Sequence, residues 1–338
     1  DPLLDIKKSD ISGEMFDVFK ESEIKNIGDV KDLFNKYIEP PPEDSVYFCL
    51  KLFKELKLID SMDDGGEITE FGSKVLEIIK VTGYNIRMAA CIVTSIDYDC
   101  QFDVCALMAI LSNINGMDGI FYKYNPALDN KKKYGAKKKH FTSDIGDIFT
   151  LRKMYETFYR KVKKLTRARL KDLCKENFLD FNRLLKIRED HLNFFRRSHI
   201  LENYKDTTVK KYDLFTNILI SLVSGYATNI AKKEGKGFKN WFPKIKTKTS
   251  VDQFSFLKKN GVNYIIYIQL KNLQGRRSYS ICSKITQNQI KTINNVYGYN
   301  INFPKSTRSR KKKGVSSKRR KIKRDLMLLR KKINNRKK

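Results

Sequence analysis

The segment EPPPE at residues 39–43 fixes the course of the chain and the start of a helix. Three consecutive prolines hold the backbone extended and offer no N–H donors, so the chain stays straight until a helix begins at about Glu43. Apolar residues then recur at helical spacing at Val46, Cys49, Leu50, Phe53 and Leu56. The segment therefore predicts an extended stretch followed by an amphipathic helix.

The sequence after this helix predicts a turn and a second helix. Residues 60–66 are polar and contain glycine, which is typical of a tight turn or wing. Glu67 and Ile68 form a short extended piece that leads into Thr69, a residue suited to cap a helix. The next apolar stripe consists of Phe71, Val75 and Ile78. Helices on both sides of a wing predict a winged-helix domain over residues 1–85.

Residues 86–235 keep helical periodicity, which predicts a helical bundle. The expected helices are 102–113, 148–162, 180–198 and 209–231. A long basic loop at 115–147 interrupts them, and loops of this length are usually functional or disordered. Its clustered cations are Lys131, Lys132, Lys133, Lys137, Lys138 and Lys139.

From Lys246 the apolar period changes to two, which indicates β-strands. The expected strands are 263–270 and 277–282, with Gly275 in the turn between them, and 287–296 is the expected closing helix. A small β-barrel over 246–303 is the simplest interpretation. The predicted fold class is therefore mainly α with a small β-barrel.

The charge balance indicates a polyanionic partner. The 338 residues carry 69 Lys and Arg against 38 Asp and Glu, a formal net charge of +31. Such a field favours nucleic acid or an anionic membrane surface. No apolar run approaches the roughly 20 residues that a membrane span requires, so nucleic acid is the favoured partner and no membrane is expected. Residues 304–338 form a basic tail expected to be disordered, yet the rest of the chain remains basic.

The cysteines and histidines do not form a metal-binding pattern. The six cysteines include no CxxC pair, and the three histidines do not complete a zinc site. The interpretation is that the thiols are buried and reduced in an intracellular protein, with nucleus or cytoplasm left open. The cysteines are Cys49, Cys91, Cys100, Cys105, Cys174 and Cys282.

The N-terminal segments resemble the C-terminal, helicase-associated region of DEAH-box RNA helicases. EPPPEDSV (39–46) and LFKELKLID (52–60) are similar to the triple-proline lead-in and following helix of that family's winged helix. EITEFG (67–72) is similar to its GELTxLG. CALMAILS (105–112) resembles its IAAMLS helix.

Further segments continue this resemblance in the same order. SD (143–144) with FTLRKMY (149–155) resembles the family's SDHLTLLNVY, and CKENFLDF (174–181) is very close to CKENFLNY. GYATNIA (225–231) resembles GLFPNVA, and the strands at 264–285 stand where the family has its OB-fold. Two family features are absent here, a PLDP segment near Lys80 and the IHP segment before the OB-fold.

The resemblance implies a winged helix, a ratchet-like bundle and an OB-fold packed against two RecA-like motor lobes. Because the first residue is Asp1 rather than Met, these lobes are expected upstream. No catalytic residue is assigned, since the chain has no Gly-Lys-Ser/Thr phosphate loop and Arg188-Glu189-Asp190-His191 falls inside a helix. No cofactor is expected in this chain: ATP and Mg²⁺ belong with the motor lobes.

Cations facing phosphates are the residues expected to bind nucleic acid. On the helix 180–198, Phe181, Leu184, Leu185 and Leu192 are expected to face inward, with cations on the other side. The simple alternative at each position is a solvated charged surface. The candidates in the helix and in the strand turn are Arg183, Lys186, Arg188, Arg197, Lys271, Arg276 and Arg277, and the loop lysines 131–133 and 137–139 complete the set.

The function expected from the resemblance is that of a DEAH-box-like accessory region. It would bind mainly single-stranded RNA and couple the motor to unwinding, while this chain alone would not hydrolyse ATP. The alternative from another class is a free-standing RNA-binding or scaffolding module without a motor. A third hypothesis, compatible with both, is a docking surface for a glycine-rich-motif activator protein.

Overall fold

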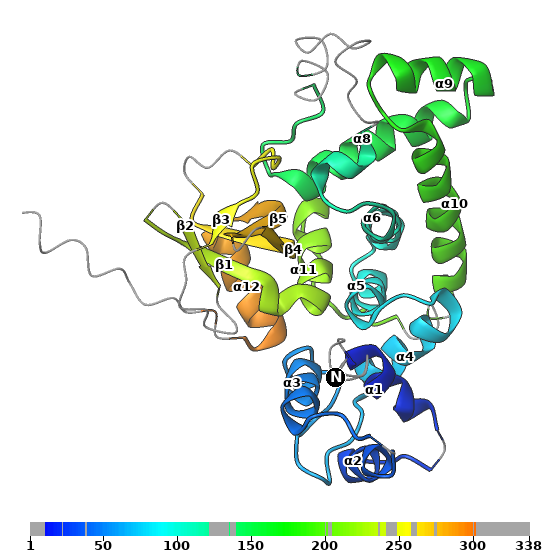
Figure 1. Cartoon of the computed structure of the whole chain (residues 1–338). Helices are drawn as coiled ribbons and strands as arrows, with labels where there is room; N and C mark the ends of the chain where they lie inside the picture. The colour runs from blue at the N-terminus through cyan, green and yellow to red at the C-terminus, as the bar shows by residue number, and fades with distance from the viewer. Residues whose placement is uncertain are drawn as a thin grey trace, which may run out of the picture. The chain divides into compact units, whose positions relative to one another are not determined.

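The computed structural model of this chain is mainly helical and contains one small β-sheet (Figure 1). It describes residues 11–21, 23–37, 39–121, 135, 140–199, 201, 205–235, 237–240, 249–257, 262–273, 276–299 and 301. The predicted fold class is confirmed at this level, as helices joined to a small barrel-like sheet. The loop lysines 131–133 and 137–139 and the basic tail lie outside the described residues.

The described N-terminal part of the chain forms short helices, two of which start at a capping side chain. They are α1 (Ser12–Asp17), η2 (Val18–Lys20), α2 (Ile27–Asn35), α3 (Glu43–Glu55) and α4 (Glu70–Thr82). The α2 helix starts with a reciprocal capping box between Asn26 and Asp29. The α3 helix starts at Glu43, as predicted from the prolines, and the Thr69 hydroxyl accepts a hydrogen bond from Gly72 N at 2.9 Å.

The predicted turn at 60–66 is closed by an antiparallel bridge between Ile59 and Ile68. Helix α4 lies very close to the residues that precede this turn. A Cβ atom at Gly72 would come within 2.3 Å of the Leu58 carbonyl oxygen. Phe16 of α1 and Phe53 of α3 pack with their ring centroids 5.1 Å apart. Glycine at 72 therefore permits the packing that holds the turn against its helix.

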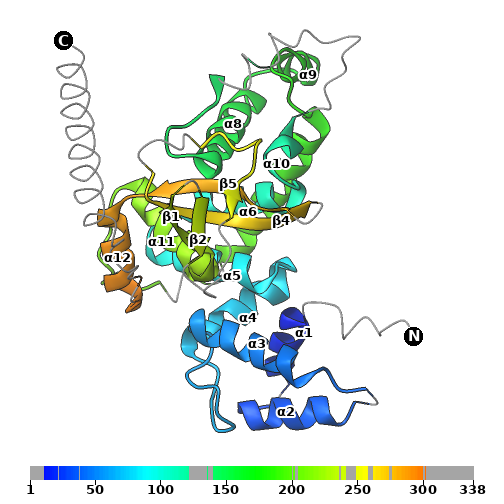
Figure 2. The same ribbon diagram turned by 60° about the vertical axis from the view of Figure 1, so that its left-hand side comes forward.

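The central helices form a layered bundle. They are α5 (Ile86–Asp97), α6 (Gln101–Asn113), η3 (Met117–Ile120), α8 (Asp147–Val162), α9 (Arg167–Glu176), α10 (Phe181–Ser198), α11 (Leu214–Tyr226) and η5 (Ala227–Asn229). Figures 1 and 2 show α5 and α6 in the middle, with α10 on one side and α11 on the other. Both central helices are almost wholly buried, as their continuous apolar sequences require.

The helix predicted at 209–231 is shorter than expected. It begins at Leu214, because the Asp213 carboxylate accepts a hydrogen bond from Thr216 N at 3.1 Å and caps it there. It ends at Tyr226, and the chain enters a strand at Ile230. The prediction was wrong at both ends, because apolar spacing alone did not separate the helix from the capped loop and strand flanking it.

The sheet has five strands and nearly closes into a barrel. They are β1 (Ile230–Glu234), β2 (Gly237–Asn240), β3 (Ser250–Val251), β4 (Tyr264–Leu273) and β5 (Arg276–Ile285), in the order β2-β1-β4-β5-β3. The β3–β5 pair is parallel. An antiparallel bridge between Phe238 and Thr249 brings the two edges of the sheet together.

The two long strands and the closing helix α12 (Gln287–Tyr297) confirm the elements predicted there. The first two strands start earlier than Lys246, where the sequence indicated the beginning of the barrel. They are short, and Gly235 forms their turn at φ 67°. Such short strands carry little periodicity, so the sequence did not indicate them. No helix in the described part of the chain has the length and apolarity to cross a bilayer.

Candidate nucleic-acid interface

The cations predicted on α10 mostly have partners within the protein. The Arg183 guanidinium donates to the Gly119 carbonyl oxygen, and Arg197 donates to the Val81 carbonyl oxygen. The Lys186 ammonium lies 3.0 Å from Asp190 Oδ1 and 3.4 Å from Glu189 Oε2. Each group can reach a phosphate only by sharing or giving up such a contact.

The buried face of α10 is centred on Leu184, Ile187, His191 and Phe194. Of the residues expected to face inward, Leu184 is buried, while Phe181, Leu185 and Leu192 are half-buried at its margins. Arg188 is also half-buried. Burial lowers the pKa of His191, and the charge of Arg188 adds a smaller effect in the same direction.

His191 is a buried structural histidine. Its Nε2 lies 3.0 Å from the Phe102 carbonyl oxygen, and its Nδ1 lies 2.8 Å from the Tyr155 hydroxyl. Because a carbonyl only accepts, Nε2 carries the proton and Nδ1 accepts from tyrosine. Burial lowers the pKa of His191 to about 4. This neutral ring joins α6, α8 and α10.

The turn between β4 and β5 places two predicted cations on β5, with a third beside them on β4. Asn272 pairs with Arg277, and Leu273 pairs with Arg276, in the β-ladder. Arg277 is exposed and forms no ion pair within the described residues. The Lys271 ammonium lies 3.3 Å from the nearly buried Asp252 carboxylate. The Arg277 side chain is therefore more available to a ligand than that of Lys271.

A strongly cationic segment of the described chain was missed by the sequence interpretation. It covers the end of α8, the turn at 163–166 and α9, and we call it the α8–α9 basic surface. Between residues 160 and 171 the sequence has seven lysines and arginines and no acid, which is the signal that could have identified it. Its exposed cations are Arg160, Lys161, Lys163, Lys164, Arg167, Arg169 and Lys171.

Several cations of this surface have no charged partner among the residues that the structure describes. Arg160 pairs with Glu156, whereas Lys161, Lys164, Arg169 and Lys171 form no ion pair within the described chain. Seven like charges within twelve residues repel one another unless counter-ions or a polyanion neutralise them. The surface is therefore better suited to phosphate binding than the paired cations of α10.

Aromatic rings continue from this surface onto α6 and α10. The Lys163 ammonium lies 5.8 Å from the centroid of the Tyr159 ring. Tyr159 lies 5.6 Å from Phe102, and Phe102 lies 5.2 Å from Phe195, between ring centroids. Phe102 is 38% exposed, so part of its ring is open to solvent. Cations beside exposed rings are typical of surfaces that bind single-stranded nucleic acid.

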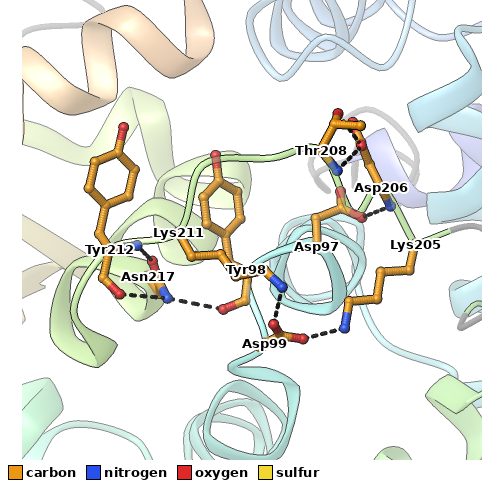
Figure 3. A network of polar contacts seen from close by, with 9 residues as sticks. All are labelled: Asp97, Tyr98, Asp99, Lys205, Asp206, Thr208, Lys211, Tyr212 and Asn217. Carbon is orange, nitrogen blue, oxygen red and sulfur yellow. Dashed lines mark hydrogen bonds and ion pairs between the residues drawn. The ribbon is translucent and has the colours of Figure 1, made fainter.

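A network of hydrogen bonds and ion pairs holds the segment 205–213 against the junction of α5 and α6 (Figure 3). The Asp99 carboxylate accepts from both Lys205 and Lys211, and the Asp97 carboxylate accepts from Asp206 N at 3.0 Å. Asn217 donates to the Tyr98 carbonyl oxygen at 3.1 Å. The α5–α6 junction thus holds the segment that leads into α11.

The described residues offer no metal cluster, and their thiols are buried. No group of three His, Cys, Asp or Glu side chains among them could hold an ion. All six cysteines are buried and free of disulfides, as expected for structural thiols. Burial raises the pKa of Cys105 to about 12, so this thiol stays protonated near neutral pH.

Comparison with known proteins finds a helicase among the relatives of this chain. No family model matches the chain. Over 209 residues it is 22% identical to the pre-mRNA-splicing factor ATP-dependent RNA helicase prp22 of Schizosaccharomyces pombe. The match covers 61% of this chain and 16% of that protein, so the chain corresponds to a small part of the relative's length. The chain is therefore similar to a region of a DEAH-box RNA helicase.

Proposed function

We propose that this chain is the accessory C-terminal region of a DEAH-box-like, ATP-dependent RNA helicase. In this role it binds single-stranded RNA and couples the movement of RecA-like motor lobes to unwinding. ATP and Mg²⁺ belong to those lobes, because the 338 residues contain no Gly-Lys-Ser/Thr phosphate loop. The similarity to prp22 over 209 residues supports the helicase association.

The α8–α9 basic surface is the observation that carries the RNA-binding part of the proposal. Its lysines and arginines are exposed on a folded helical pair, and four of them have no ion-pair partner among the described residues. Cations without ion-pair partners can contact phosphates with little loss of side-chain contacts. The predicted cations Arg183, Lys186, Arg188, Arg197, Lys271, Arg276 and Arg277 would add contacts around it.

The topology of the sheet supports an OB-fold within the proposed architecture. With the Phe238–Thr249 bridge, the strands run in the circular order β1-β2-β3-β5-β4, with β3 parallel to β5. This is the winding order of OB-fold barrels, which bind oligonucleotides through a strand face and the loops after the first and fourth strands. Arg277 lies beside the second of these loops.

The N-terminal part supports the proposed winged helix. Helices α2, α3 and α4 flank a turn that the Ile59–Ile68 bridge closes, which is the helix, helix, wing, helix order expected from the sequence. In the proposed assembly, the winged helix and the barrel also offer surfaces for a glycine-rich-motif activator protein. The helical bundle between them corresponds to the ratchet-like domain.

The test is a binding and hydrolysis assay on the whole chain. We expect tighter binding to a fluorescein-labelled single-stranded RNA than to a duplex of equal length, because exposed bases add stacking to the phosphate contacts. We expect no ATP hydrolysis with or without RNA. Equal binding to the duplex would contradict single-strand recognition, and measurable turnover would contradict the assignment of ATP chemistry to separate lobes.

The second candidate is a free-standing RNA-binding or scaffolding module. It is favoured by the presence of the α8–α9 basic surface and the barrel in one chain that has no phosphate loop of its own. The coding sequence upstream of Asp1 separates the two functions. A RecA-like motor in the same reading frame supports the helicase region, and a start codon next to Asp1 supports the free-standing module.

A further inference from the structure

A cavity of about 470 Å³ lies at the junction of α5, α6 and α10. This volume falls within the range of about 300–1,000 Å³ that small-molecule sites occupy. Its wall combines apolar and polar side chains, as sites for flat heterocyclic groups require. The lining residues are Ile96, Asp99, Gln101, Phe102, Phe195 and Lys205.

The apolar wall of the cavity is an aromatic pair. Phe102 lies in the first turn of α6 and Phe195 lies near the end of α10, and their rings meet edge to face at 81° with centroids 5.2 Å apart. The Phe102 ring also packs at 4.4 Å against the buried His191 ring. The contact with the buried His191 ring therefore fixes the position of Phe102. The exposed part of the Phe102 ring remains available to stack on a ligand.

The polar wall offers both hydrogen-bond acceptors and a cation. Gln101 Nε2 donates to Ser198 Oγ at 2.6 Å, and Ser198 Oγ donates to the Phe195 carbonyl oxygen, which fixes the orientation of the Gln101 amide. Within the described chain, the Gln101 side-chain carbonyl accepts no hydrogen bond. At the rim, Asp99 pairs with Lys205 (Figure 3).

A series of ring contacts links the cavity wall to Lys163 of the α8–α9 basic surface. Lys163 lies against Tyr159, Tyr159 contacts Phe102, and Phe102 forms the cavity wall. A strand whose phosphates lie on the lysines of the α8–α9 turn therefore passes the Tyr159 ring on its way to the cavity. Rings beside a cationic track are the arrangement that holds unstacked bases.

We propose that this cavity is a nucleobase pocket that receives one unstacked base of a single-stranded RNA. The base stacks against the Phe102–Phe195 pair, and an exocyclic amino group donates to the Gln101 carbonyl. Adenine and cytosine carry such an amino group on the edge that also bears the pairing atoms, whereas uracil does not. The inference rests on the proposed RNA-binding function and adds a specific base site to it.

The experiment compares two labelled strands of equal charge by fluorescence anisotropy. One is a twelve-residue oligoadenylate, and the other has each base replaced by an abasic spacer. The whole wild-type chain should bind the oligoadenylate about tenfold more tightly, since stacking on an aromatic side chain is sequence-tolerant but needs a base. Phe102→Leu and Phe195→Leu should each reduce this ratio by about fivefold without changing the salt dependence, because neither change removes a cation that neutralises a phosphate.

Phe48→Leu is the matched control, because Phe48 is 65% exposed and lies on α3, away from the cavity lining. It should retain the wild-type ratio. Circular dichroism checks that each variant is folded. If Phe102→Leu unfolds, the result for Phe195→Leu alone decides the test. An unchanged ratio in folded cavity variants, or an equal loss in Phe48→Leu, overturns the base pocket alone. Failure of wild type to bind either strand overturns the proposed RNA-binding function as well.

Discussion

The Asp147 carboxylate accepts a hydrogen bond from the backbone N–H of Cys282 at 2.8 Å, which joins the start of α8 to strand β5. Ser255 Oγ and Phe256 N also donate to this carboxylate, each at 2.6 Å. Asp147 is fully buried, and burial raises its pKa to about 6. One buried acid therefore connects the helical bundle to the barrel.

Replacing Asp147 by asparagine should destabilise this connection. Three donors converge on two carboxylate oxygens, whereas asparagine has one acceptor oxygen and places an NH₂ group against at least one of them. The free energy of unfolding at pH 7 should fall by about 1–3 kcal/mol, measured by urea denaturation. Asp172→Asn, at an exposed acid on α9, should change it little, and equal effects would contradict this role for Asp147.

The Asp147 carboxyl group should also make the stability of the fold depend on pH. Because the pKa of Asp147 is raised from 3.8 to about 6, the folded state binds the proton more tightly than the unfolded state. The stabilisation that comes from binding this proton is therefore present at low pH and is lost as pH rises through about 6, whereas the three hydrogen bonds to the carboxylate remain. Stability curves of wild type and Asp147→Asn should diverge in slope between about pH 4 and 6, and parallel curves would contradict the raised pKa.

His191 has the opposite pH dependence. Its pKa is lowered from 6.5 to about 4 by burial, so the unfolded state binds the proton more tightly. Its contribution to stability is present above about pH 6.5 and is lost on acidification towards pH 4. In His191→Gln, the free energy of unfolding should lose part of its rise with pH across this interval. A variant that keeps the full wild-type rise would show that other groups cause it.

The Tyr155 hydroxyl should stabilise the neutral His191 ring. Tyr155→Phe removes the donor to Nδ1 and leaves a buried acceptor without a hydrogen bond. The free energy of unfolding should decrease by about 1–2 kcal/mol in urea denaturation at pH 7. Thr157→Val, at an exposed position further along α8, is the control. An equally small effect of both changes would contradict a stabilising hydrogen bond between Tyr155 and His191.

Phosphate contacts on the α8–α9 basic surface should appear in the salt dependence of RNA binding. Changing Lys161, Lys164, Arg169 and Lys171 to glutamine should lower the slope of log K against log salt by about two to three, at roughly 0.7 per contact with a single strand. The single variant Lys164→Gln removes one charge from this surface, and Lys186→Gln is its control. The control removes the same charge from a lysine that is ion-paired with Asp190. An equal change of slope from both single variants would contradict the preference for the α8–α9 basic surface over the α10 cations predicted from the sequence.

Deleting residues 305–338 should weaken RNA binding at low salt and flatten its salt dependence. This tail holds 18 lysines and arginines and one acid, Asp325. The shortened chain neutralises fewer phosphates, so fewer counter-ions are released when the RNA binds. If affinity and slope both stay at the wild-type values, the tail serves a purpose other than RNA binding.

Local signals predicted much of the fold. Each of these signals depends on residues that are close together in the sequence. They are the prolines before Glu43, the capping hydroxyl of Thr69 and the two alternating strands on either side of Gly275. The features that the sequence did not predict depend on distant partners. Asp147 receives its donors from residues more than 100 positions away, and the cap at Asp213 shortened a helix whose apolar periodicity suggested a longer one.

The candidate site was predicted only in part for a related reason. Arg183 and Arg197 donate to carbonyl groups 64 and 116 residues away, which no spacing rule foresees. The charge run at 160–171 was visible in the sequence, but its lack of acidic partners depends on the packing of neighbouring helices. The contact between Phe102 and Phe195 likewise joins two helices that are far apart in the chain.

The central claim is that folded parts of this chain, and not its basic tail alone, hold single-stranded RNA. Ultraviolet crosslinking of the whole chain to 4-thiouridine-containing RNA, followed by peptide mass spectrometry, tests it most directly. Crosslinks in the α8–α9 segment and near the β4–β5 turn are the expected result. Crosslinks confined to residues 305–338, or none above those obtained with the denatured chain, would contradict the claim.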